Sequence, residues 1–158
     1  MSMDVGKVGL PGYSEFNGKA FTMEGEGHDI GGIDDSFHFA YAPMTGDGTI
    51  TARVIRPMSS QWTKPGVMMR ETLDADSRHA SVLLIPHWSG ALVTRSKKGG
   101  ETTLHKARYL GEKNVIKKNR LSTPYWLRLI RFRNRFTGYM SSDGYNWRDL
   151  GSAEIPMA

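Results

Sequence analysis

The chain contains no cysteine among its 158 residues, so neither a disulfide nor a thiol nucleophile can contribute to its structure or chemistry. It has no run of 18 apolar residues, so we expect no membrane-spanning helix. The first twelve residues, MSMDVGKVGLPG, lack the apolar stretch of a signal peptide. We expect an intracellular protein, one whose signal has been removed, or a piece of a longer chain, and we favour the last two.

Several catalytic and metal-binding motifs are also missing. The five histidines show neither His-x-x-x-His nor His-Glu-x-x-His spacing, which makes a zinc site improbable. The segment Gly25–Gly31 has a misplaced third glycine and no helix pattern after it, so it is not a dinucleotide fingerprint. No nucleophile elbow is present, although a Ser-His-Asp triad assembled by the fold stays open.

What the chain does contain is a series of short alternating segments between turns. In Thr49–Ile55, Ile50, Ala52 and Val54 share one face while Thr51 and Arg53 share the other. Eighteen glycines and seven prolines supply the turns. The predicted strands are Ala20–Met23, Phe37–Tyr41, Thr49–Ile55, Gly66–Glu71, His79–Ile85, Ala91–Arg95, Thr102–Arg108, Trp126–Phe132, Phe136–Ser141, Asn146–Leu150 and Ala153–Ile155. These strands predict an all-β fold, a two-sheet antiparallel β-sandwich or jelly roll in one domain spanning residues 1–158. Tyr109–Asn119 is the one segment that reads as helical or irregular.

Charge is distributed unevenly along the chain. Residues 1–79 carry seven Lys/Arg against eleven Asp/Glu, whereas residues 80–158 carry fourteen against five. Two interpretations remain open for the basic half. It could bind an anionic partner such as an acidic polysaccharide or nucleic acid. It could equally be the solvated outer face of a sheet, because a strand with one face buried exposes the other, and we favour this interpretation.

A set of segments resembles a known bacterial family. They include Asp4-Val5-Gly6, Gly27–Gly31, Asp35–Phe39, Gly46–Val54, Trp62–Arg70, Ser77–Ala80, Trp126–Leu129 and Ser142–Trp147. Together they resemble the concanavalin A-like (laminin G-like) jelly-roll domain of largely unassigned function that occurs beside glycosidases, including at the C-terminus of β-xylosidase-type enzymes. The resemblance covers about residues 4–156. It implies a jelly roll with a concave sheet face, a connection with carbohydrate and a secreted or cell-surface bacterial location, but it supplies no catalytic residues. Pro65 and the basic run Lys113–Arg120 depart from the family pattern.

Aromatic side chains are the usual means of binding sugars, because a pyranose ring stacks its C–H face on an indole or phenol. Trp88 is the strongest candidate, since it lies in the turn-like His87-Trp88-Ser89-Gly90 where no core requires it. Trp62 lies in a polar loop context and is the second candidate. Trp126 and Trp147 flank the hairpin and are expected to have a core or structural role, because buried indoles commonly anchor sandwiches.

Polar residues could complete such a ligand-binding site. Arg70, His79 and Arg95 lie on three successive predicted strands and could point into the concave face, with Lys64 and Glu71 adding to the site. A guanidinium offers a planar fork to vicinal hydroxyls or to a uronate carboxylate. The alternative is a structural network of cross-strand ion pairs, which we favour.

Loop aspartates suggest a structural calcium ion, which sandwiches like the resembled family often carry. Asp29, Asp34 and Asp35 are the proposed metal ligands, because calcium takes hard oxygen ligands from loops. No EF-hand loop is present, and aspartates also stabilise turns through their own backbone. The turn from Ser141 to Trp147 resembles the Asp-box hairpin of glycan-handling β proteins, and we expect its aspartate to satisfy turn amides and its tryptophan to plug the hairpin.

These observations favour a non-catalytic, lectin-like carbohydrate-binding module, accessory to a secreted glycan-degrading protein, that binds a polysaccharide or oligosaccharide on its concave sheet face. The ligand could be acidic, and we expect a monomer or a module of a larger protein, with no membrane partner. A hydrolase or lyase on the same fold is one alternative, although Glu24 and Glu26 lie in a glycine-rich turn and do not form the paired carboxylates of a glycosidase. A structural or interaction domain without glycan binding, or a nucleic-acid binder, is the other.

Overall fold

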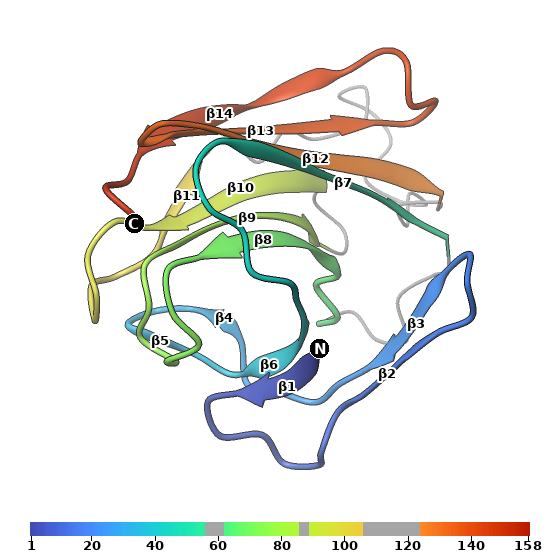
Figure 1. Ribbon diagram of the computed structural model, residues 1–158, viewed down its shortest axis with the longest axis vertical. Helices are drawn as coiled ribbons and strands as arrows, with labels where there is room; N and C mark the ends of the chain where they lie inside the picture. Colours follow the sequence, from blue (N-terminus) through green and yellow to red (C-terminus); the bar gives the residue numbers. More distant parts are fainter. Residues whose placement is uncertain (56–61, 86–88, 106–123) are drawn as a thin grey trace, which may run out of the picture.

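The computed structural model describes residues 1–55, 62–85, 89–105 and 124–158, and the regular structure in these residues is entirely β-strand (Figure 1). The strands are β1 (Ser2–Val5), β2 (Tyr13–Phe16), β3 (Phe21–Glu24), β4 (Ile30–Gly31), β5 (Asp34–Asp35), β6 (Phe37–Ala40), β7 (Gly48–Val54), β8 (Gly66–Arg70), β9 (His79–Ile85), β10 (Ser89–Arg95), β11 (Thr103–His105), β12 (Tyr125–Phe132), β13 (Arg135–Ser141) and β14 (Arg148–Glu154). In the described parts of the chain, no helix is long and apolar enough to cross a membrane.

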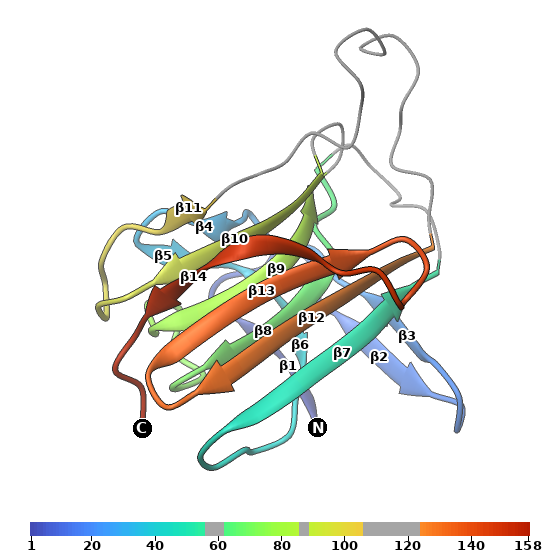
Figure 2. The same ribbon diagram turned by 90° about the horizontal axis from the view of Figure 1, so that it is seen from above.

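Two four-stranded antiparallel sheets form the body of the molecule. One has the strand order β14-β13-β12-β7 and the other β11-β10-β9-β8. Figure 1 shows the sheets as two stacked layers, and Figure 2 shows the strands of the first sheet from outside. The predicted all-β fold of antiparallel sheets is confirmed, and the stacked arrangement is consistent with the predicted sandwich.

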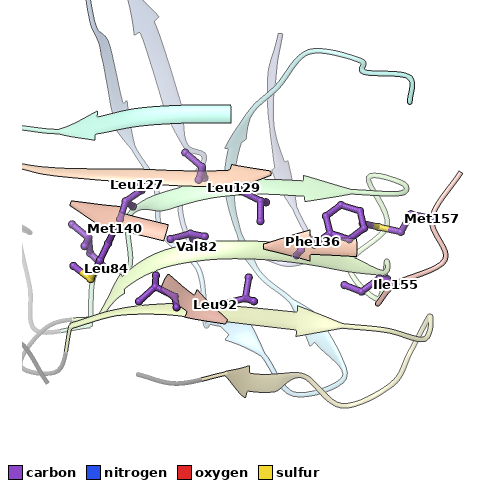
Figure 3. Packing of buried hydrophobic residues seen from close by; sticks show 12 residues of the cluster. Val82, Leu84, Leu92, Leu127, Leu129, Phe136, Met140, Ile155 and Met157 are labelled. Atoms are coloured by element: carbon purple, nitrogen blue, oxygen red, sulfur yellow. The ribbon is translucent and has the colours of Figure 1, made fainter. Parts of the chain in front are cut away.

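The core lies between these two sheets because alternate residues of their strands are apolar. Leu127 and Leu129 of β12 point inward, as the sequence alternation predicted, and meet Val82 and Leu84 of β9 (Figure 3). Gly138 of β13 lets the sheets approach closely, because a Cβ at this position would lie 2.8 Å from Cγ2 of Val82.

A third layer covers the other face of the β8–β11 sheet. It consists of the two-stranded sheets β1-β6 and β4-β5, which lie below β8 and β9 in Figure 1. Leu83, Ala91 and Val93 are buried on this side, with Ile30 of β4 packed against them. Strands of the central sheet are therefore buried on both faces, which explains the continuous apolar run of β9.

The predicted strands that lie in the described residues occur within a few residues of their expected ends. The sequence prediction divided this region into two strands, Asn146–Leu150 and Ala153–Ile155, whereas the structure has the single strand β14. A register shift opposite Gly138 and Tyr139 bends this strand, and Gly151 adopts a φ of +113° there. Strands β1, β2, β4 and β5 were not predicted, because each has no more than four residues and so shows little periodicity. The segments Tyr109–Asn119 and Lys113–Arg120 lie outside the described residues.

Candidate functional site

Three of the predicted ligand-binding residues lie side by side in a buried cluster of polar and charged side chains. Arg70, His79 and Arg95 are direct neighbours across β8, β9 and β10, as expected for residues that share one sheet face. The face they share is the one covered by β4-β5, and none of the three side chains is more than 2% exposed. Asp35 of β5 is their counter-ion, and its carboxylate is fully buried.

The Arg95 guanidinium is saturated by contacts within the protein. It donates to the two carboxylate oxygens of Asp35 at 2.7 and 2.9 Å. Its remaining hydrogen bonds reach backbone carbonyls of Gly32, Ala75, Ser77 and Gly100, which belong to three separate loops. This side chain ties the third layer and the loops to the central sheet, and such a paired and fully hydrogen-bonded charge can be buried.

Arg70 and His79 complete the cluster from either side of Asp35. Arg70 Nη1 lies 3.2 Å from Asp35 Oδ2, and burial lowers the pKa of this guanidinium despite the carboxylate. Burial, with smaller contributions from Arg95 and Arg70, lowers the pKa of His79 to about 4 against the opposing effect of Asp35. His79 is therefore neutral at pH 7, and its Nε2, 3.8 Å from Asp35, has no hydrogen-bond partner among the described residues.

The other predicted ligand-binding residues are dispersed. Glu71 follows β8 and accepts a hydrogen bond from Arg78 at 3.3 Å. Lys64 pairs with Asp29 at 2.5 Å, and Trp62 is 76% exposed. Trp88 lies outside the described residues. The structure therefore brings Arg70, His79 and Arg95 together in the protein interior, and a role in ligand binding for these residues and for Trp62, Lys64 and Glu71 stays a prediction.

The proposed calcium ligands do not converge. Asp35 is buried against two arginines, whereas Asp34 beside it is exposed, and Asp29 holds Lys64 and the Ile30 amide. Among the described residues, no group of three or more His, Asp or Glu side chains is arranged to hold a metal ion. Calcium binding stays a prediction.

The turn after β13 has the structure that its sequence predicted. Asp143 Oδ1 accepts hydrogen bonds from the amides of Tyr145 and Asn146 at 2.8 and 2.7 Å, and Oδ2 accepts one from the Asn146 side chain. These bonds hold the pKa of the Asp143 carboxyl well below its ordinary value, the Asn146 side chain contributing most. The expected role of the aspartate is confirmed.

The best candidate for a binding surface is the outer face of the β14-β13-β12-β7 sheet. No described element covers it in Figure 2. We define the open face by residues that alternate with the buried core positions and by Trp147, which packs beside them: Thr51, Arg53, Trp126, Arg128, Tyr139 and Trp147. Trp126 lies between Arg53 and Ser141 in one cross-strand row, and Arg128 lies between Thr51 and Tyr139 in the next. Three aromatic side chains on one solvated sheet face form a surface typical of a contact site, since aromatics and arginine are enriched there.

Arginines hold the aromatic rings of this face in place. The guanidinium carbon of Arg128 lies 3.7 Å from the ring centroid of Trp147, and that of Arg53 lies 5.7 Å from the ring of Trp126. Arg128 also donates from Nε to the Thr51 hydroxyl at 3.1 Å. Trp126, Tyr139 and Trp147 are each only partly buried, so part of each side chain is accessible to solvent.

A cleft lies at the end of this face, beside the Asp143 turn. It has a volume of about 220 Å³ and is lined by Tyr125, Met140, Ser141, Ser142, Asn146, Trp147 and Arg148. Pockets that enclose drug-sized ligands measure about 300–1,000 Å³, so this cleft is smaller than such a pocket. Trp147 belongs to both the cleft and the open face, which makes them one continuous surface.

Sequence reasoning assigned Trp126 and Trp147 a core or structural role and did not single out Arg53 or Arg128. The signal that could have found them is the alternation of β12, in which Leu127 and Leu129 point inward. The same pattern that buries these leucines exposes Trp126 and Arg128 on the opposite face.

A hydrogen-bonded relay connects three N-terminal segments. His38 of β6 bonds through Nδ1 to Asp4 of β1 at 2.7 Å and through Nε2 to the Ser14 hydroxyl of β2 at 2.9 Å. The bond to His38, followed by the Gly12 amide, lowers the pKa of Asp4. Gly12 closes on the imidazole so tightly that a Cβ there would lie 2.2 Å from Nδ1. The order carboxylate, imidazole, hydroxyl is that of a serine hydrolase triad.

Comparison with known proteins identifies no relative. No protein-family model matches the chain, and neither a curated protein nor a solved structure matches it. Membership of the concanavalin A-like family stays a prediction.

Proposed function

We propose that this chain is a non-catalytic carbohydrate-binding module with a jelly-roll arrangement of its sandwich. Its polysaccharide ligand lies across the open face, with one sugar ring entering the cleft beside Trp147. The observation that carries the proposal is the grouping of three aromatic side chains, Trp126 and Tyr139 on the sheet and Trp147 beside them against Arg128, on a face that no described element covers.

The chemistry of this surface suits a sugar chain. Indole and phenol rings present apolar faces for the C–H groups of a pyranose, and they are large and lose little conformational freedom on binding. Hydroxyl and guanidinium groups of Thr51, Arg53 and Arg128 border the rings and can exchange hydrogen bonds with sugar hydroxyls. Because such contacts replace hydrogen bonds with water, we expect weak binding to any single chain.

The experiment is affinity gel electrophoresis against a panel of neutral and acidic polysaccharides, with calcium and with chelator. Trp147→Ala and Tyr139→Ser should lose retardation, whereas Trp62→Ala should keep it, since Trp62 lies outside the open face. Thermal melting of each variant separates loss of binding from loss of the fold. If only Trp62→Ala loses retardation, ligand binding on the open face is contradicted, and the ligand binds instead at the loop that contains Trp62. No retardation by any polysaccharide would contradict carbohydrate binding itself.

The Asp4–His38–Ser14 relay favours a second candidate, hydrolysis of an ester through a serine nucleophile. In this reaction His38 Nε2 accepts the Ser14 proton as Oγ bonds to the acyl carbon, and the proton then passes to the departing alkoxide. Water subsequently hydrolyses the acyl-serine and restores the hydroxyl. The relay also has a structural explanation, because it fastens the β2-β3 hairpin to β1 and β6.

A fluorophosphonate probe distinguishes the two roles of the relay. The probe should label Ser14 of the wild type and of the control variant Ser36→Ala, but not of His38→Gln. This pattern would establish an activated nucleophile. Absence of labelling, together with a lowered melting temperature of Ser14→Ala, would leave the relay as a structural anchor.

A further inference from the structure

The open face carries an excess of positive charge that the protein itself does not neutralise. Arg53 and Arg128 belong to the face, and Arg148 lines the cleft at its end. None of these three guanidinium groups forms an ion pair with a carboxylate of the described residues. Elsewhere in the structure arginines find partners, as Arg70, Arg78 and Arg95 do.

Acidic side chains near these arginines are engaged in other contacts. Asp149 sits next to Tyr139 in the cross-strand row, and its carboxylate accepts a hydrogen bond from the Gly151 amide at 2.5 Å. Asp143 is held by the amides of its own turn. Glu154 at the far end of the sheet lies 4.0 Å from Arg135. These amide bonds do not remove the negative charge of Asp149 or Asp143, but neither carboxylate forms an ion pair with Arg53, Arg128 or Arg148 among the described residues, so all three guanidinium groups can pair with an external anion.

The arrangement of the arginines suits an anion held beside a sugar ring. Arg53 pairs directly with Trp126, and Arg128 follows Trp126 by two residues, so the two arginines are diagonal neighbours, a relation in which long side chains can reach one another. Arg128 uses Nε for Thr51 and its plane for Trp147, which leaves its terminal nitrogens to donate outward. A guanidinium donates two parallel hydrogen bonds to a carboxylate or a sulfate, and these charge-assisted bonds are stronger than neutral ones.

We infer that the glycan recognised by the open face bears acidic groups, carboxylate or sulfate, which Arg53 and Arg128 contact while the ring stacks beside Trp126 and Trp147. This inference rests on the proposed carbohydrate-binding function and assigns its substrate class. The guanidinium of Arg148 contacts an acidic group on the sugar that enters the cleft.

The test compares polymers that differ in charge and share one backbone. Polygalacturonate and its fully methyl-esterified form make such a pair, and heparin with its desulfated form makes a sulfated pair. At low ionic strength we expect the charged member of at least one pair to bind at least about 10-fold more tightly than its neutral partner. The preference should decline with added salt, because salt screens exposed charges.

Variants locate the charge dependence. Arg53→Gln and Arg128→Gln should each weaken binding of the charged polymer by about 10-fold, with little effect on the neutral one. Arg135→Gln is the matched control, since Arg135 lies on the same sheet face but beside Glu154. Circular dichroism and melting temperature of each variant report the fold.

The outcomes separate this inference from the proposed function. Equal binding of charged and neutral members, still lost in Trp147→Ala, overturns the acidic ligand and leaves carbohydrate binding standing. If Arg135→Gln weakens binding of the charged polymer as much as Arg53→Gln and Arg128→Gln do, the inference of an acidic glycan is overturned in favour of unspecific attraction to polyanions. Binding of a DNA duplex as tight as that of the charged polymer has the same consequence. No binding of any polymer, charged or neutral, overturns both.

Discussion

Replacement of Asp35 by Asn is expected to destabilise the protein strongly, because it removes the carboxylate at the centre of the buried charge cluster. Asp35 accepts two hydrogen bonds from Arg95 at 2.7 and 2.9 Å and one from Arg70 at 3.2 Å. The asparagine side chain keeps the shape but removes the carboxylate that pairs with both buried guanidinium groups in the described part of the chain. One of the two side-chain oxygens is replaced by an NH₂ group, which then faces an N–H donor of an arginine.

The magnitude follows from the burial of the partners. Removal of one partner from a buried ion pair costs about 3–5 kcal/mol, because the remaining charge stays desolvated and unpaired. Natural domains are stable by about 5–15 kcal/mol, so this loss is a large share of the total. For a chain of this length each kcal/mol lowers the melting temperature by about 2–4 °C, which gives a decrease on the order of 10 °C.

The assay is urea unfolding at pH 7 followed by tryptophan fluorescence, with Asp34→Asn as the matched control. Asp34 is the adjacent residue of β5 and is exposed, so its substitution should change the free energy of unfolding by no more than about 0.5 kcal/mol. If Asp35→Asn is as stable as Asp34→Asn, the buried charge cluster does not hold the third layer in place and the reasoning is refuted.

Three further predictions concern pH and packing. Burial lowers the pKa of His79 to about 4, whereas a histidine in an unfolded chain has a pKa of about 6.5. The unfolded state therefore takes up a proton first, and the free energy of unfolding should fall by about 3 kcal/mol as the pH decreases from about 6.5 to about 4. Urea unfolding at several pH values should show this loss in wild type and not in His79→Gln; an equal pH dependence in both would contradict it. The pKa of Asp143 is lowered by its turn, so the stability advantage of wild type over Asp143→Asn is present above about pH 4 and should shrink as the pH falls further, which thermal melting at pH 7 and pH 3 can measure. A constant difference at both pH values would argue against the role of the carboxylate. Gly138→Ala places a methyl group 2.8 Å from Cγ2 of Val82 and should cost about 1–3 kcal/mol, measured against Thr137→Ala on the opposite face; equal stability of the two variants would show that the sheets can separate freely.

Alternation in the sequence predicted the strands of the two main sheets because their inner residues are consistently apolar. The pattern of β12 and the run of β9 each follow from burial on one or both faces. Strands β4 and β5 contain two residues each, and so short a segment has no periodicity to detect. Their position is instead determined by Asp35, which lies 60 residues from Arg95 in the sequence but directly beside it in the fold.

The candidate site was harder to predict because exposure cannot be judged from residue type. Arg95 and His79 have the chemistry of ligand-binding residues, yet the third layer buries both of them. Trp126 and Trp147 have the chemistry of core residues, yet they lie on the open face. The alternation of β12 separates Trp126 from the buried leucines, but which sheet face the third layer covers is decided by tertiary packing, and that buries Arg95 and His79.

The most direct test of the proposed function is chemical-shift mapping of the isotopically labelled protein during titration with an oligosaccharide of the polymer that retards it. The tryptophan indole N–H signals report on both candidate locations in one spectrum. We predict that the signals of Trp126 and Trp147 move together with the amides of Arg128 and Tyr139, while that of Trp62 stays in place. Shifts confined to Trp62, Lys64 and the loops around them would contradict binding on the open face.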